Sequence, residues 1–234
     1  GNITLENGSD TDEEAVNASG SGNILIDALA GNVQINSDVF SGTGHITVKG
    51  GVDIALAAGV DVVTGTPGTV SFDAETGELS MDGTANIEAT DSSVRLKGKQ
   101  DVTLGNVTAT NVSILSNEDV VNAAGSSKNV TATNLRIDAE GSVGVAGRHI
   151  TTDITNLSVL ASNSSIFITE DNGAVVTSVT VTVTDFNSDA TTTPVTDADQ
   201  SDLTTGDNGD IVLVATLGNI TLENGSDTDE EAVN

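Results

Sequence analysis

Carboxylates are the most abundant chemically reactive side chains of this chain, and one dense set lies near its C-terminal end. Five aspartates recur there at the alternating spacing that offers oxygen ligands to a hard cation such as Ca²⁺: Asp197, Asp199, Asp202, Asp207 and Asp210. An EF-hand is excluded, because its sixth position would be Asp202 instead of glycine and its twelfth Asn208 instead of glutamate. The spacing therefore predicts an irregular, structural calcium loop, which calorimetric titration with Ca²⁺ would detect; the alternative is an exposed loop whose acids are simply solvated.

Two other clusters offer weaker chemistry. Asp10, Asp12, Glu13 and Glu14 form a second candidate cation site, although consecutive acids usually mark a solvated loop. Arg148, His149 and Asp153 are the one grouping suited to acid–base work, but an aspartate near an arginine is more often a surface ion pair. Polysaccharide-cleaving sites also use aromatic stacking, and the chain has no Trp or Tyr. We therefore predict that the chain is not an enzyme and holds no organic cofactor.

The overall charge limits the partners. The 35 acidic residues outnumber the 7 Lys and Arg, for a formal net charge of −28. Such a surface repels nucleic acid and anionic lipid, and it attracts divalent cations and basic partners. The only local basic patch is Arg95, Lys97 and Lys99, for which alternation predicts the outer face of a strand. It could meet an acidic neighbouring rod or an anionic glycan, but a simple solvated strand edge is favoured. No apolar run is long enough to span a membrane, so we expect no membrane insertion.

A short recurring sequence motif positions these side chains. It consists of a turn residue, then Asn, Asp or His, then an apolar–any–apolar triplet, as in 22–26, 31–35, 44–48 and 209–213. Less regular copies place the apolar pair at Ile54 and Leu56, Ile87 and Ala89, Val94 and Leu96, Val102 and Leu104, Val112 and Ile114, Leu135 and Ile137, Leu157 and Val159, and Ile166 and Ile168. Each copy of the motif predicts a very short strand with two inward residues.

The spacing of these strands favours a solenoid over a sandwich. Ile87, Val112, Leu135 and Leu157 lie at similar intervals, which indicates coils of roughly 22 to 25 residues with two or three strands each. We predict an all-β, elongated, right-handed parallel β-helix (β-solenoid) with acidic loop excursions, whose asparagines stack in hydrogen-bonded ladders at the corners. The alternative is two Ig-like sandwiches of about 100 residues each.

Three segments interrupt the rhythm. Residues 185–208 are acidic and contain Pro194, so we expect them to leave the rod, and residues 7–21 form a second acidic loop. Residues 59–83 contain Pro67 and several glycines, which predicts a hairpin-like protrusion around Phe72, Leu79 and Met81.

The largest repeat is an exact duplication. Residues 1–17 return unchanged as residues 218–234, so we interpret the chain as one 217-residue tandem repeat, 1–217, and the first 17 residues of the next. We expect 1–234 to form a single β-helix segment that continues into identical neighbours. Residues 1–5 and 218–222 should then form the same strand at opposite ends of one elongated molecule.

The strings Gly-Asn-Ile-Thr-Leu (1–5 and 218–222) and GDIVLVATLGNITLENG (209–225) resemble the repeats of filamentous-haemagglutinin-like giant bacterial exoproteins and adhesins. The resemblance implies a secreted, right-handed β-helical protein that mediates attachment.

Repetition and resemblance together predict a structural or adhesive stalk repeat of a very large bacterial protein, extracellular or on the cell surface. Its expected partners are the adjacent identical repeats and cell-surface glycans or proteins, with end-to-end self-association through the bare rod ends. The alternatives are a glycan-binding or calcium-dependent module, tandem Ig-like adhesin repeats and, last, a polysaccharide-active enzyme.

Overall fold

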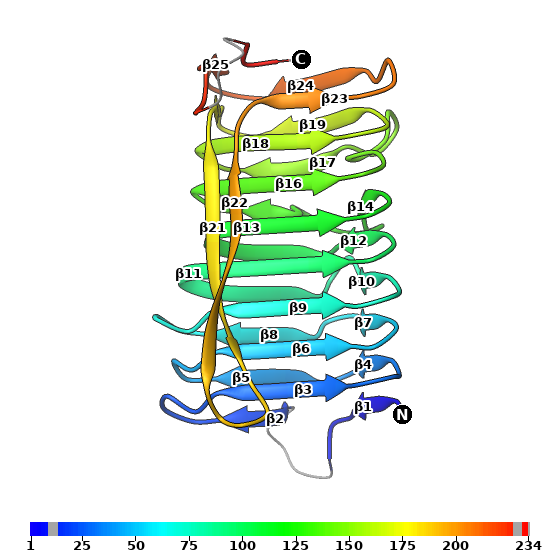
Figure 1. Ribbon diagram of the computed structural model, residues 1–234, viewed down its shortest axis with the longest axis vertical. Helices are drawn as coiled ribbons and strands as arrows, with labels where there is room; N and C mark the ends of the chain where they lie inside the picture. The colour runs from blue at the N-terminus through cyan, green and yellow to red at the C-terminus, as the bar shows by residue number, and fades with distance from the viewer. Residues whose placement is uncertain (9–13, 227–230, 234) are drawn as a thin grey trace.

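The computed structural model describes residues 1–8, 14–226 and 231–233, and these residues form strands and turns without any helix. Within them there is accordingly no helix that could cross a membrane. Short parallel strands stack coil upon coil along the long axis, and the two termini lie at opposite ends (Figure 1). The all-β prediction is confirmed, and parallel pairing on this scale excludes the antiparallel Ig-like sandwiches.

The strands stack in three ladders, and most coils contribute a strand to each of the three. Ladder A contains β1 (Ile3–Leu5), β4 (Val33–Ile35), β7 (Ile54–Leu56), β10 (Leu79–Met81), β12 (Val102–Leu104) and β14 (Val120–Asn122). Single bridges at Val143 extend it to β19 (Ile166–Glu170) and β24 (Ile211–Ala215).

Ladder B contains β2 (Glu14–Ala18), β5 (Asp38–Ser41), β8 (Asp61–Thr64), the first halves of β11 (Asn86–Gly98) and β13 (Asn106–Ser116), β15 (Val130–Thr131) and β17 (Ile150–Asp153). Its last strand pairs with β19, so ladders A and B merge at the C-terminal end.

Ladder C contains β3 (Ile24–Ala28), β6 (Ile46–Gly50), β9 (Val70–Ala74), the second halves of β11 and β13, β16 (Asn134–Ala139) and β18 (Asn156–Ala161). On β18 lie β20 (Val175–Val176) and then β25 (Thr221–Leu222) at one half, and β23 (Leu203–Thr205) at the other.

The predicted inward residues are the core. All of the apolar pairs from Ile24 to Ile168 named above are at most 8% exposed. Most coils advance by 18 to 25 positions, as from Val102 to Val120 and from Ile54 to Leu79. One expected stack is wrong: Val112 lies on Val94, whereas Ile87 lies under Val107, because β11 and β13 each turn a corner and serve two ladders.

The hairpin predicted for residues 59–83 does not form. This segment supplies β8, β9 and β10, one strand to each ladder, with Phe72 and Leu79 fully buried in the core. Its glycines serve tight corners instead of a protrusion. A Cβ atom at Gly68 would lie 2.3 Å from the carbonyl oxygen of Gly44 in the coil below, so only glycine fits there.

The other two excursions differ from expectation in extent. In the segment 7–21, residues 14–18 are strand β2, and residues 9–13, with Asp10, Asp12 and Glu13 of the second candidate cation site, lie outside the described residues. The C-terminal excursion covers 177–202 and forms an antiparallel hairpin of β21 (Val179–Phe186) and β22 (Thr192–Gln200). Figure 1 shows that this hairpin folds back along the rod, almost perpendicular to the coils. We call residues 177–202 the strap.

The two copies of the duplicated sequence lie at opposite ends, as expected, but on different ladders. Ile3 to Leu5 pair with β4 in ladder A, whereas the identical Thr221 and Leu222 pair with β20 in ladder C. The expectation of one shared strand position is therefore wrong for this structure.

The predicted asparagine ladder is confirmed where ladder C begins. Asn111, Asn134 and Asn156 are in register in three successive coils. The amide of Asn134 donates to the Oδ1 of Asn111, and the amide of Asn156 donates to the Oδ1 of Asn134, each at 2.7 Å. The central member makes both ladder bonds.

We therefore expect Asn134→Ala to lower the free energy of unfolding by about 1–3 kcal/mol, because it breaks two amide–amide bonds. Asn156→Ala breaks only one of these bonds and is the matched control. Urea unfolding followed by circular dichroism measures both. Equal losses at the two positions would show that the ladder bonds do not set the stability of this corner.

Candidate functional site: the strap and the face beneath it

The strap covers one row of outward side chains on ladder C. Because inward and outward residues alternate along each strand, the residues between the core positions face out. Six of them are in register from coil to coil: Thr47, Ser71, Arg95, Ser113, Arg136 and Ser158. All six are at most 9% exposed although they face away from the core. We call them the covered row.

Valines of β21 form the underside of the strap. Val179, Val181 and Val183 are 1–3% exposed, whereas Thr180 and Thr182 between them are exposed. The strand packs across β6, β9, β11, β13, β16 and β18. Sequence alternation therefore gives this segment one apolar face, and the apolar face is placed on the outside of the rod wall.

Charged and polar bonds fix the strap along its length. The Nε of Arg95 donates to both carboxylate oxygens of Asp197, at 3.1 and 3.0 Å, and both side chains are almost fully buried. Near the base, the Nε of Arg136 donates to the carbonyl of Ala198 at 3.1 Å. Near the tip, Lys49 lies 3.5 Å from Asp185. Three of the seven basic side chains of this acidic chain, Lys49, Arg95 and Arg136, therefore contact the strap.

Hydroxyl groups bind the backbone of the strap near its tip. The Oγ1 of Thr69 donates to the carbonyl of Thr184 and accepts from its N–H, both at 3.0 Å. The N–H of Phe186 donates to the Oγ1 of Thr47 at 2.8 Å. The Nδ1 of His45 accepts from the N–H of Thr69 at 3.2 Å, so this imidazole supports the residue that holds the strap.

The basic patch predicted at Arg95, Lys97 and Lys99 is therefore open only in part, at the exposed Lys99. Arg95 is buried against the strap, and Lys97 pairs with Asp73 of the coil below at 3.0 Å. The acidic partner expected from another molecule is supplied, for Arg95, by Asp197 of the same chain, 102 positions away.

The five aspartates predicted to bind calcium are distributed over several elements. Asp197 pairs with Arg95, and Asp199, on the opposite side of β22, accepts from the hydroxyl of Thr180. Asp202 precedes β23, and Asp207 and Asp210 flank the turn into β24. Among the described residues, no three His, Asp or Glu side chains are grouped in a way that could hold a metal ion. Calcium binding stays a prediction.

The residues considered for acid–base chemistry also have separate partners. His149 contacts Thr169, with Nδ1 and Oγ1 2.9 Å apart, and Asp153 accepts from the amide of Asn172 at 2.9 Å. Arg148 lies in a turn closed by backbone bonds to Val145. The prediction that the chain is not an enzyme is not tested by these contacts.

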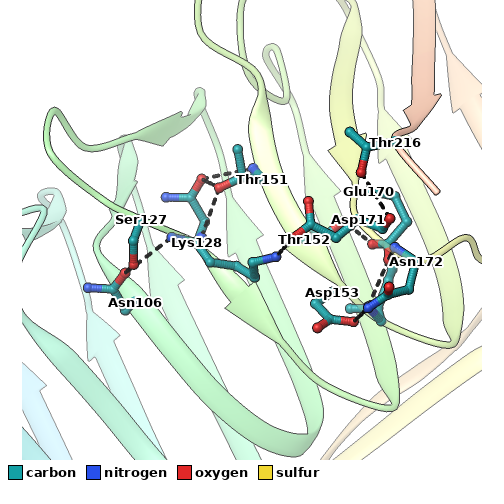
Figure 2. A network of polar contacts seen from close by, with 12 residues as sticks. Asn106, Ser127, Lys128, Thr151, Thr152, Asp153, Glu170, Asp171, Asn172 and Thr216 are labelled. Carbon is teal, nitrogen blue, oxygen red and sulfur yellow. Dashed lines mark hydrogen bonds and ion pairs between the residues drawn. The ribbon is translucent and has the colours of Figure 1, made fainter.

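A buried carboxylate organises the corner beside Asp153 (Figure 2). Glu170 is fully buried and accepts from the hydroxyl of Thr152 at 2.5 Å and from the N–H groups of Ile154 and Asn172 at 3.2 and 3.0 Å. Its neighbour Asp171 forms an ion pair with Lys128. Each donor comes from a turn or an adjoining coil, so the network fixes the corner and leaves this carboxylate enclosed.

Two shallow grooves adjoin along the rod near this corner. They measure about 380 and 280 Å³ and share Ala132 and Asp153. Threonines from successive coils line the first, together with Glu88 and Asp91, and no aromatic ring lines either groove. Their walls offer hydroxyl and carboxylate oxygens but no stacking platform for a sugar.

Sequence reasoning found the strap segment and the cations but not their pairing. The available signal was the strict Val–Thr alternation of 179–184 beside an acidic tract, together with two arginines at outward strand centres. Comparison with known proteins adds no name: no family model, no curated protein and no solved structure matches the chain.

We expect Asp197→Ala to loosen the strap by about 3–5 kcal/mol, because it leaves the guanidinium of Arg95 buried without its counter-charge. Amide hydrogen exchange of β21 and β22 measures this loss directly. Asp199→Ala, two residues along on the exposed side of the same strand, is the matched control and should cost less than about 1 kcal/mol. Equal losses would contradict a special role for the buried pair.

Mild acid should weaken the strap tip. Burial lowers the pKa of His45 from its ordinary value of 6.5, so the unfolded chain takes up this proton at a higher pH than the folded one. The stabilisation is complete above about pH 6.5 and is lost as the pH falls toward the lower folded pKa.

Hydrogen exchange near Thr184 should therefore accelerate between pH 7 and 5.5 after correction for intrinsic exchange rates. His45→Gln should remove this pH dependence, and His149→Gln, at the other histidine, should leave it in place. An unchanged pH dependence in His45→Gln would exclude His45 as its source.

Proposed function

We propose that this chain is a structural and adhesive stalk repeat of a very large secreted or cell-surface bacterial protein. In this proposal the three ladders close into a right-handed parallel β-helix, the hand favoured for parallel crossover connections. The observation that carries the proposal is the position of the duplicated sequence: its two copies lie at opposite ends of a stack of coils. A chain built in this way extends by adding coils to its ends.

Three properties of the described residues suit such a role. Parallel stacking satisfies the strand backbone from coil to coil, so copies add length without new interfaces. The strap binds coils from β6 to β18 to one another, which gives lateral stiffness. The net charge of −28 keeps an all-β surface soluble and repels neighbouring rods. Attachment then results from many weak contacts presented along the stalk.

A second candidate, glycan or cation binding, is favoured by the grooves beside Asp153. Their threonine hydroxyls and carboxylates come from successive coils and therefore recur along the rod. A glycan array distinguishes the two roles. Binding that Asp153→Asn abolishes would assign the groove as a module, and no binding would favour the spacer.

The stalk proposal predicts that length grows in equal steps. Chains of one, two and three copies should lengthen by about 43 Å per copy, because nine ladder A levels stack at about 4.8 Å each. Small-angle X-ray scattering gives the maximum dimension of each chain, and a one-copy chain of matched concentration controls for association. Copies that fold as separate, flexibly linked bodies would contradict the proposal.

A further inference from the structure

The contact between the strap and the covered row is chemically mismatched. The underside of β21 is a row of valines, whereas the covered row consists of hydroxyls and two guanidinium groups. Buried polar atoms without a hydrogen-bond partner gather at this contact and at the base of the strap: Ser113 Oγ, Ser158 Oγ, Arg136 Nη1, Asp185 Oδ1 and Gln200 Oε1. Such atoms lose solvation without compensation, so the strap is held less tightly than its buried area implies.

Most of the positive-φ residues lie in or just after the strap. Of the five non-glycine residues with positive φ in the described chain, four lie between 190 and 208: Ala190, Asp202, Asp207 and Asn208. Aspartate and asparagine adopt this conformation readily, whereas it strains alanine, so the backbone strain of the strap lies at Ala190 near its tip.

The sequence of the strap also fits a second position. Val179, Val181 and Val183 follow Leu157, Val159 and Ala161 by 22 positions, the same advance by which Leu157 follows Leu135. Inward residues of ladder C alternate in the same way. These valines therefore match a next strand of ladder C stacked upon β18, a place that β20 and β23 occupy in the structure.

The segment after the strap contains two sequence motifs, and earlier copies of both motifs join different ladders. Thr205-Gly206, Gly209 and Ile211 repeat the spacing of Thr64-Gly65, Gly68 and Val70, which lead from ladder B to ladder C. At 205–211, however, the same motif leads from β23 in ladder C to β24, which pairs with β19.

The second motif overlaps the end of the first. Residues 209–222 repeat the spacing of 22–35, with glycine, isoleucine, alanine, glycine and asparagine at matching positions. Residues 22–35 lead from ladder C to ladder A. If both motifs joined the same ladders as their earlier copies, 203–205 would lie in ladder B, 211–215 in ladder C and 218–222 in ladder A. Ladder A is where the identical residues 3–5 lie.

We propose that residues 175–222 have two docking modes and that a following copy of this chain selects the second. In the strap mode, described above, the hairpin covers ladder C, and β20 and β23 pair with β18. In the ladder mode, β20 leaves β18 and the valines take its place, 184–200 become an exposed acidic loop, and 203–205, 211–215 and 218–222 each move to another ladder. The proposal rests on the tandem repetition within the proposed function.

A following copy has a physical reason to favour the ladder mode. Its strand equivalent to β4 pairs with Gly-Asn-Ile-Thr-Leu only if that string lies in ladder A, as β1 does. Each further coil of the new copy adds bonds that depend on this phase. The change also releases Asp197 and uncovers Arg95 and Arg136, which exposes cationic groups on an acidic rod.

The two modes place the tip of the strap at different ends of the repeat. The chain has no cysteine, so Leu29→Cys and Ser188→Cys, both at exposed positions, accept spin labels without background. In the strap mode the tip lies near β6, beside Lys49, and in the ladder mode it lies about six coils higher. The label separation should therefore increase by about 30 Å, since coils stack at about 4.8 Å.

We expect a single short separation in the 234-residue chain by dipolar electron paramagnetic resonance. A two-copy chain labelled in its first copy should show the longer separation as its main population. Asp197→Asn should increase that population further, because the carboxylate of Asp197 pairs with Arg95 only in the strap mode, whereas Asp199→Asn should change it little.

A two-copy chain with only the short separation, both with and without Asp197→Asn, would overturn the two-mode proposal. The scattering length of the same sample separates this failure from that of the stalk. A chain of full two-copy length with only the short separation would leave the stalk intact. A chain that does not lengthen would contradict the stalk itself.

Discussion

The structure depends on one constraint: the inward side chains of each coil must lie on the inward side chains of the coil below. Parallel strands pair coil to coil, so a strand that slips by one residue would turn its apolar pair outward. Small branched side chains satisfy this constraint in a narrow interior. Phe72 is the only fully buried phenylalanine among the described residues, and the other fully buried apolar side chains are Ile, Leu, Val and Ala. Corners then close with glycine and with asparagine ladders such as Asn111, Asn134 and Asn156.

This constraint explains how much the sequence alone could predict. A local alternation identifies inward residues, and every predicted core pair from Ile24 to Ile168 is buried. Alternation does not say which ladder a strand joins, so the predicted place of Ile87 is wrong. Glycine and proline mark corners and protrusions alike, and for that reason the sequence predicts a hairpin at residues 59–83, which form three ladder strands.

The strap exposes a deeper limit of such reasoning. Val179, Val181 and Val183 have the pattern of core residues, and they are buried, but against the outside of the wall. The alternation of apolar and polar residues shows that one face of a strand is apolar, but it does not show what packs against that face. The pairing of Arg95 with Asp197 joins residues 102 positions apart, and no local signal specifies such a contact. The aspartates chosen as calcium ligands illustrate the same point, because acids close in sequence were directed to opposite sides of one strand.

Charge and phase together determine what this rod can do. Arg95 and Arg136 lie under the strap and Lys49 beside its tip, so three of the seven basic side chains contact the strap, and the chain as a whole stays strongly anionic. In the proposed stalk, an anionic rod repels its neighbours sideways, and copies add along the stacking axis. Growth at an end requires that the identical strings 1–5 and 218–222 meet the same ladder. In this structure they do not, because 3–5 lie in ladder A and 221–222 in ladder C. In the proposed stalk, continuous addition of copies therefore requires the segment between β18 and the duplicated string to rearrange, and the unsatisfied polar atoms under the strap lower the cost of that step.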